Sequence, residues 1–185
     1  MRGSCLSILL LTACPLLGGQ SGGDPCIDDA NACGNGGVLE VDPTCERDDA
    51  LHLELGEGDG DFSMLVPGAE PELVSGPQGG EHMVLGIGID NPSPEHLSFE
   101  VAVTLSVDDE GESEPLAERT VVYDGDLVQF DAGRAELLNL VIVPDHWPSD
   151  GRRWISVEVT DGCGRTGTVD HAVDAPASDT DGATD

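Results

Sequence analysis

Apolar and polar residues alternate with a period of two in four separate segments of this 185-residue chain. The apolar positions are Leu51, Leu53 and Leu55; Met83, Leu85, Ile87 and Ile89; Leu97, Phe99, Val101, Val103, Leu105 and Val107; and Ile155, Val157 and Val159. Because successive side chains of a β-strand point to opposite faces of a sheet, the pattern predicts strands with one buried and one solvated face. Such strands are typical of antiparallel sheets.

Other apolar segments predict further strands. Residues 137–143 are apolar on both faces and fit a central strand, whereas only residues 132–138 fit a helical turn. Weaker strands are expected near residues 62–66, 117–123, 127–130 and 167–173. Turn-forming pairs separate the segments: Pro67-Gly68, Gly76-Pro77, Asn91-Pro92, Asp124-Gly125, Asp150-Gly151 and Asp161-Gly162. Many short strands joined by turns predict an all-β sandwich or barrel.

The end of this pattern resembles part of a known fold. Residues 157–169, Val-Glu-Val-Thr-Asp-Gly-Cys-Gly-Arg-Thr-Gly-Thr-Val, resemble the last hairpin of immunoglobulin-like and fibronectin-III-like domains. The resemblance implies an antiparallel sandwich of that type, which we expect over residues 50–174. In such domains the first strand begins at the pole where the last hairpin turns. Cys163 is therefore expected beside the chain just before residue 50.

The first residues of the chain have the features of an export signal. Arg2 precedes a short apolar run over residues 6–11, which is too short to span a bilayer as a helix of about 20 residues. The string Leu11-Thr12-Ala13-Cys14 resembles the lipobox of bacterial lipoproteins. The resemblance implies removal of residues 1–13 and attachment of a diacylglycerol to the Cys14 sulfur, usually with an acylated amine such as a palmitoyl amide. An ordinary secretory signal cut near residues 18–19 is the alternative.

This resemblance implies an exported protein of the bacterial cell envelope, held to a membrane by lipid. Two or more acyl chains anchor a protein stably, whereas one does not. Residues 14–24 then form the lipidated cysteine and a flexible Gly-rich tether. Pro15 stands where some bacteria use an Asp for inner-membrane retention, which favours the outer membrane.

Four of the six cysteines are candidates for disulfide bonds once Cys5 and Cys14 are assigned to the signal and the lipid: Cys26, Cys33, Cys45 and Cys163. Three pairings are possible, and each ties the N-terminal segment to Cys163 by one bridge. The resemblance of the last hairpin favours Cys45–Cys163, which leaves Cys26–Cys33 as a local loop. Zinc binding is the alternative, but the closely spaced cysteine pairs of zinc sites are absent. Residues 25–49 are thus predicted to be irregular and pinned by disulfides.

The chain is strongly acidic. It contains 37 Asp and Glu residues against 7 Lys and Arg residues, and its formal net charge is −30. Such a charge repels nucleic acid and anionic lipid headgroups, so neither is expected as a partner. The expected partners are a membrane, through lipid on Cys14, and other envelope or extracellular proteins. Residues 175–185 are expected to be a disordered acidic tail.

One further string carries a resemblance. The sequence Gly76-Pro77-Gln78-Gly79-Gly80-Glu81-His82 resembles a recurring segment of uncharacterised bacterial lipoproteins that have one β-sandwich domain. The resemblance implies a fold and an envelope location, and no activity. The glycines themselves are explained by a turn that requires positive φ.

Metal binding has two sets of candidate residues. Two Asp-Gly-Asp strings offer the oxygen ligands that calcium prefers, although neither continues as an EF-hand loop: Asp59 and Asp61, and Asp124 and Asp126. Three histidines could converge across neighbouring strands as ligands of a transition metal: His52, His82 and His171. A module that binds calcium or a small ligand is therefore the alternative function.

The sequence favours a protein without catalytic activity. No predicted strand leads into a Gly-x-Ser-x-Gly elbow, and a His-Glu-x-x-His motif and a phosphate-binding loop with Lys are absent. No cofactor is expected. A hydrolytic enzyme is the third possible function, after a protein that displays a β-sandwich and a module that binds calcium or a small ligand. Trp147, between His146 and Pro148, is the one aromatic residue with an expected functional role. The main expectation is an envelope protein that displays a β-sandwich for protein interaction, adhesion or envelope structure.

Overall fold

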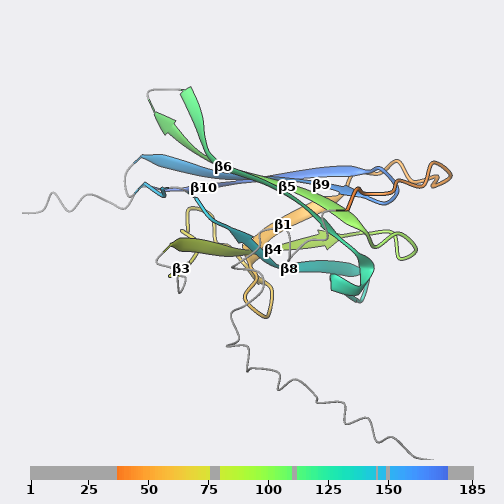
Figure 1. Cartoon of the computed structure of the whole chain (residues 1–185). Helices are drawn as coiled ribbons and strands as arrows, with labels where there is room; N and C mark the ends of the chain where they lie inside the picture. Colours follow the sequence, from red (N-terminus) through yellow and green to blue (C-terminus); the bar gives the residue numbers. More distant parts are fainter. Residues whose placement is uncertain (1–36, 76–79, 110–111, 145, 149–150, 175–185) are drawn as a thin grey trace, which may run out of the picture.

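The protein is a β-sandwich of two antiparallel sheets (Figure 1). The computed structural model describes residues 37–75, 80–109, 112–144, 146–148 and 151–174. One sheet contains β1 (His52–Glu57), β2 (Ser63–Met64), β3 (Leu73–Ser75), β4 (Glu81–Asp90), β7 (Val128–Asp131) and β8 (Arg134–Ile142). The other contains β5 (Phe99–Asp109), β6 (Glu112–Tyr123), β9 (Arg152–Asp161) and β10 (Thr166–Val173). A short 3₁₀ turn, η1 (Gly125–Leu127), leads into β7.

The strand order is that of an immunoglobulin-like sandwich. In one sheet the order is β2-β1-β4-β8-β7, with β3 also paired to β4, and in the other it is β10-β9-β5-β6. Apart from the short β2 and β3, these orders correspond to strands A-B-E-D and G-F-C-C′ of the immunoglobulin fold. The predicted fold class is confirmed.

The alternating apolar residues fill the space between the sheets. Phe99 and Val101 on β5, Ile155 and Val159 on β9, and Ile87 on β4 are all 0% exposed. Within the sheet, the neighbouring strands β5 and β9 are paired so that Val101 lies beside Val159 and both point into the core. The period of two in the sequence therefore marks the buried face of each long strand, as predicted.

Two segments differ from the prediction. Residues 132–138 are the one stretch in which the sequence allows a helical turn, but Ala132 and Gly133 form a two-residue hairpin turn between β7 and β8. Both residues have positive φ, 50° and 85°, as type I′ turns require. β3 was not predicted, because three residues are too few to show alternation. The central strand expected over 137–143 is confirmed as β8, which lies between β4 and β7.

Glycines on the outer face of β1 and β4 make room for the loop that follows β1. A Cβ atom on Gly56 would lie 2.7 Å from the Phe62 side chain, and one on Gly86 would lie 3.1 Å from it. Phe62 therefore covers this part of the sheet. The Arg134 guanidinium lies over the Phe62 ring, 5.0 Å from its centroid, and donates a 2.7 Å hydrogen bond to Glu54 Oε2.

The N-terminal segment is fixed to one pole of the sandwich. Cys45 forms a disulfide with Cys163, which lies in the turn between β9 and β10. The Asp42 amide also donates a 2.8 Å hydrogen bond to the Gly162 carbonyl. The predicted Cys45–Cys163 bridge is thus confirmed, and we call this end of the molecule the disulfide pole. Cys14, Cys26 and Cys33 lie outside the described residues.

Candidate functional site

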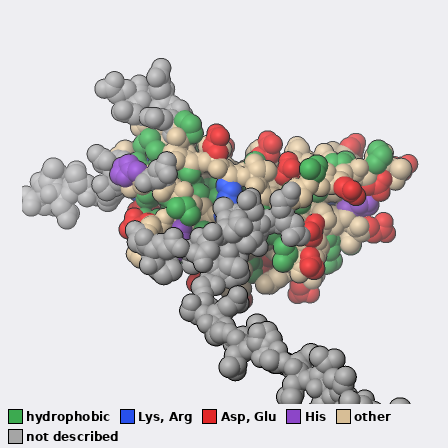
Figure 2. Space-filling model, viewed as in Figure 1, with side chains coloured by type: hydrophobic (Ala, Val, Ile, Leu, Met, Phe, Trp, Pro, Cys, Tyr) green, Lys and Arg blue, Asp and Glu red, His purple; other side chains and the backbone are tan. Residues whose placement is uncertain are grey.

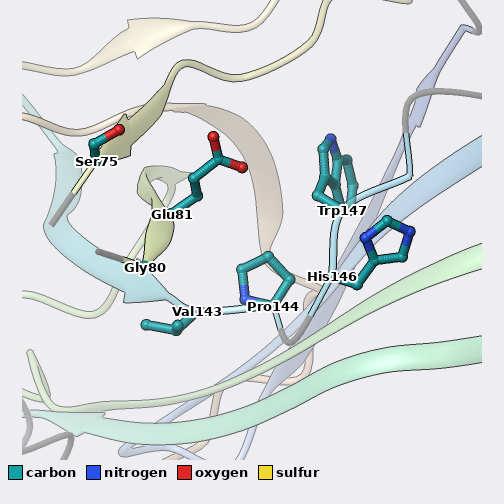
Figure 3. Close-up of a pocket in the computed structure, with 7 residues that line it drawn as sticks. All are labelled: Ser75, Gly80, Glu81, Val143, Pro144, His146 and Trp147. Atoms are coloured by element: carbon teal, nitrogen blue, oxygen red, sulfur yellow. The ribbon is translucent and has the colours of Figure 1, made fainter. Parts of the chain in front are cut away.

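Figure 3 shows a pocket in the structure. It lies at the end of the sandwich where β4 and β9 begin, opposite the disulfide. Both β4 and β9 run between the two poles: β4 begins with Glu81 beside the pocket, and β9 ends with Asp161 next to the disulfide turn. We call this end the pocket pole. The cavity has a volume of about 430 Å³. Its lining residues are Ser75, Gly80, Glu81, Val143, Pro144, His146 and Trp147.

The pocket combines an apolar wall with several polar groups. Ser75 ends β3 and Glu81 begins β4, whereas Pro144, His146 and Trp147 belong to the segment between β8 and β9. Figure 3 shows Glu81 between Ser75 on one side and Trp147 on the other. A few polar groups around an apolar surface are typical of sites that bind a small molecule or a side chain of a protein partner.

Trp147 is held in place by a buried arginine. The Arg153 guanidinium lies 5.2 Å from the Trp147 ring centroid, and Arg153 is only 1% exposed. Both residues donate 2.7 Å hydrogen bonds to Glu70 Oε1, and Arg153 also donates a 2.9 Å bond to the Pro148 carbonyl. A side chain fixed in this way loses little conformational entropy on binding, which favours recognition. The functional role predicted for Trp147 stays a prediction.

The polar groups of the pocket are not linked to one another. Within the described residues, no hydrogen bond joins Ser75, Glu81 and His146. Nucleophilic catalysis by a hydroxyl usually needs such a bond between the nucleophile and its base. Ser75, Glu81 and His146 thus line one cavity without bonding to one another.

The predicted calcium ligands occupy surface turns, where Asp59, Asp61 and Asp126 are exposed and Asp124 is half-buried. Asp59 and Asp61 lie in the loop after β1, whereas Asp124 precedes η1 and Asp126 lies within it. In the described part of the chain, none of the four belongs to a group of three or more ligand atoms within reach of one ion. The structure therefore brings no set of these carboxylates together.

The three histidines considered together are also separated. His52 on β1 lies opposite Asp90, at the far end of β4 from His82. Eight residues of strand at about 3.3 Å each separate Asp90 from His82 by about 26 Å. His171 is buried, and its Nε2 is 2.7 Å from the Ala69 carbonyl oxygen. These histidines therefore do not share a site.

One cluster was not predicted from the sequence. At the disulfide pole, ligand atoms of Cys45, Cys163 and His96 lie within 4.8 Å of one another, and they are the only such group within the described ranges. His96 Nε2 is 3.0 Å from Asp42 Oδ2, and Nδ1 is 3.1 Å from Ser93 Oγ. Nothing in the sequence spacing places His96 beside the two cysteines, because the three residues come from separate segments.

Hydrogen bonds lower the pKa values of two carboxyl groups at the disulfide pole, Asp42 and Asp49. The side chain and the backbone amide of Thr44, followed by His96, lower the pKa of Asp42 from 3.8 to about 2. Hydrogen bonds from Arg47 lower the pKa of Asp49 in the same way. Both carboxylates are therefore ionised at neutral pH and help to hold the N-terminal segment in place.

The remaining surface is acidic, and no membrane-spanning helix lies in the described residues. Acidic side chains are scattered along the face seen in Figure 2. The sequence matches no known protein family and no curated protein.

Proposed function

We propose that this chain is a lipid-anchored protein of the bacterial cell envelope that displays a non-catalytic β-sandwich for binding to other envelope or extracellular proteins. The observation that supports this most directly is the separation of the two poles. The chain leads into the sandwich at the disulfide pole, and the pocket lies at the other end. A tether from Cys14 would therefore leave the pocket pole facing away from the membrane.

The distance between the poles follows from strand length. β9 runs over ten residues, and its nine steps of about 3.3 Å give about 30 Å between the pocket pole and the disulfide pole. The disulfide and the bond from Asp42 to Gly162 attach the N-terminal segment directly to the turn after β9. Any pull from the anchor is therefore taken up at the disulfide pole, and the pocket is left undisturbed.

The pocket pole has features that suit a protein partner. Trp147 is held rigidly, and Val143, which lines the same cavity, is 61% exposed. Rigid aromatic residues, tryptophan above all, are typical of the centres of protein interfaces. Glu81 and His146 add groups that can form hydrogen bonds at the edge of such a contact.

The lipid anchor is tested by changing the lipidation site. We expect Cys14→Ala to abolish incorporation of a palmitate analogue and to move the full chain from the membrane fraction to the soluble fraction, because the acyl chains are the proposed anchor. The measurement is metabolic labelling followed by fractionation of expressing cells. Cys5→Ala is the matched control, since Cys5 belongs to the proposed signal and should change neither result. Membrane attachment that survives Cys14→Ala would refute the anchor.

The orientation is tested with the two natural tryptophans. Trp147 lies at the pocket pole, and Trp154 is near the start of β9 at the same end. For the lipidated chain in vesicles, we expect quencher-labelled lipids to leave tryptophan fluorescence unchanged, whereas a soluble quencher should reduce it. Quenching by the lipids would show instead that the pocket pole lies on the membrane.

A further inference from the structure

We propose that Cys45, Cys163 and His96 form a zinc site that is used when the disulfide between the two cysteines is reduced. The disulfide and the metal would be alternative states of one cluster at the disulfide pole. This inference does not depend on the proposed role of the pocket pole. It differs from the zinc alternative considered for the four cysteines, because it uses a histidine and neither Cys26 nor Cys33.

The ligand atoms already lie close enough for one ion. The two sulfur atoms and one ring nitrogen of His96 are within 4.8 Å of one another. Zinc binds sulfur at about 2.3 Å and histidine nitrogen at about 2.0–2.1 Å, so its ligand atoms lie roughly 3–4 Å apart. Only small side-chain rotations are therefore needed once the sulfurs separate. Two thiolates and an imidazole are ligands that zinc prefers.

His96 is oriented as a metal-binding histidine usually is. One ring nitrogen is 3.0 Å from Asp42 Oδ2 and the other is 3.1 Å from Ser93 Oγ. Whichever nitrogen binds the ion, the other keeps an oxygen partner that fixes the ring. The three protein ligands would leave the fourth position of the ion to a water molecule.

The backbone around the cluster is held without the disulfide. The Cys163 amide donates a 3.0 Å bond to Asp161 Oδ1, and the Cys45 amide donates a 3.2 Å bond to the Asp42 carbonyl. The His96 amide donates a 3.0 Å bond to the Ser93 carbonyl. These bonds fix the turn that carries each ligand. The Asp42 amide, which donates a 2.8 Å bond to the Gly162 carbonyl, joins the segments of Cys45 and Cys163. Arg165 Nη2, which donates a 3.2 Å bond to the Asn91 carbonyl, joins the turn after β9 to the loop that carries His96. All three ligand side chains are partly exposed, which gives a reductant and a metal ion access.

The chemistry balances with a dithiol as the reductant. The dithiol gives two electrons and two protons to the Cys45–Cys163 bond, so that two thiols form and the dithiol becomes a cyclic disulfide. A zinc ion then binds the two sulfurs, and both thiol protons are released to water. A disulfide oxidant, such as the cyclic disulfide of the dithiol, would reverse these steps: it would take two electrons from the zinc-bound thiolates and two protons from water, return to the dithiol, and leave the Cys45–Cys163 bond and a free zinc ion.

The test measures metal binding to the full chain before and after reduction. The protein is reduced with dithiothreitol, freed of the reductant without oxygen, and titrated with zinc or cobalt(II). We expect one metal ion per reduced chain and none per oxidised chain. Cobalt should give the thiolate charge-transfer and d–d absorption of a tetrahedral site, and zinc should displace it. Cys26→Ser with Cys33→Ser should leave this binding unchanged, because neither residue belongs to the cluster.

Two histidine variants separate a metal site from a general effect of reduction. We expect His96→Gln to weaken zinc binding by roughly 100-fold or more. Replacing a residue that only supports a metal ligand typically lowers the affinity by about 10–100-fold, so the loss of a ligand itself should be at least as large. His52→Gln is the matched control, since His52 is exposed and lies outside the cluster. Equal binding by the His96 variant, or loss of binding in the Cys26 and Cys33 variant, would overturn the proposal. A reduced chain that loses its circular-dichroism signal and does not regain it with zinc would overturn it as well.

Discussion

At the level of single residues, Arg165 connects three segments of the chain at the disulfide pole through its contacts with Asp161, Asn91 and Asp49. Its Nε and Nη2 donate bonds of 2.9 and 2.7 Å to Asp161 Oδ2, and Nη2 also reaches the Asn91 carbonyl at 3.2 Å. Nη1 is 3.2 Å from Asp49 Oδ1. Asp161 is 0% exposed and also accepts the amide of Cys163. This buried pair therefore connects the last hairpin to the loop after β4 and to the N-terminal segment.

Replacing Arg165 should destabilise the fold strongly. Arg165→Met leaves the Asp161 charge buried without its cation, and loss of one partner of a buried pair typically costs about 3–5 kcal/mol. The free energy of unfolding in urea measures this. Arg152→Met is the control, because Arg152 is exposed and its contact with the Trp154 ring should be worth about 1 kcal/mol or less. Similar losses for the two variants would contradict the prediction.

Asp42 should give the disulfide pole a dependence on pH. Its pKa is lower in the folded protein, at about 2, than its ordinary value of 3.8. A carboxyl group of this kind stabilises the fold above its unfolded pKa, and the stabilisation is lost as the pH falls through the folded value. The contribution should therefore be complete above about pH 5 and should disappear towards pH 2.

The corresponding variant isolates this effect. Asp42→Asn should be less stable than the natural chain at neutral pH, and the difference should shrink as the pH falls from about 5 to about 2. Urea unfolding of both proteins across that range measures it. The control is Asp126→Asn, at an exposed position in η1. A difference that stays constant with pH would show that Asp42 acts through packing rather than through its charge.

At the level of elements, glycines in β1 and β4 leave the space that the loop after β1 needs to pack on the outer face of the sheet. A Cβ atom on Gly56 would lie 2.5 Å from the Ser63 carbonyl oxygen, which belongs to the paired backbone of β2. On Gly88 it would collide with the Arg134 guanidinium. The glycines on β1 and β4 therefore allow the loop with Phe62 to cover the outer face, which strand alternation alone does not reveal.

A single methyl group should disturb this packing. Gly56→Ala places a Cβ atom against backbone that cannot move without breaking the pairing of β1 and β2, and overpacking of this kind typically costs about 1–3 kcal/mol. Gly80→Ala is the matched control, because nothing lies within 4 Å of its Cβ position. Urea midpoints compare the two. Equal midpoints would show that the loop with Phe62 can move away at little cost.

At the level of the whole molecule, the disulfide closes a loop that contains most of the sandwich. Cys45 and Cys163 are 118 residues apart in the sequence. A bridge over so long a loop reduces the entropy of the unfolded chain and should stabilise the fold by about 4–5 kcal/mol in the chain-entropy model. Since the core is formed by both sheets independently of the bridge, the fold itself should survive its removal.

The double variant Cys45→Ala with Cys163→Ala tests this. We expect a native circular-dichroism spectrum and a free energy of unfolding that is lower by up to about 4–5 kcal/mol. Dithiothreitol should destabilise the natural chain far more than the variant, which keeps only the predicted local Cys26–Cys33 bridge, and the comparison separates the Cys45–Cys163 bridge from other effects of the reductant. Complete unfolding of the variant would show that the disulfide is required for folding.

Several features of the fold could be predicted because they are local properties of the chain. The side-chain period of a strand is set by backbone geometry, so alternation identified the buried positions of β4, β5 and β9 before any sheet was known. The pairs Asn91-Pro92 and Asp161-Gly162 marked the ends of β4 and β9, whereas no predicted pair marked either end of β5. The Cys45–Cys163 bridge followed from the resemblance of the last hairpin, since the pole at which the first strand begins is a property of that fold.

The sites, by contrast, were decided by tertiary structure. His96 meets the two cysteines only because the loop after β4 and the turn after β9 reach the same pole. Trp147 is oriented by Arg153, an arginine at an inward position of β9 where alternation leads one to expect an apolar residue. Periodicity describes which way each side chain points, but not which distant segment it meets. Which segments meet depends on how the two sheets pack. The sequence alone therefore determined the strands, whereas the packing of the sheets determined the clusters around His96 and Trp147.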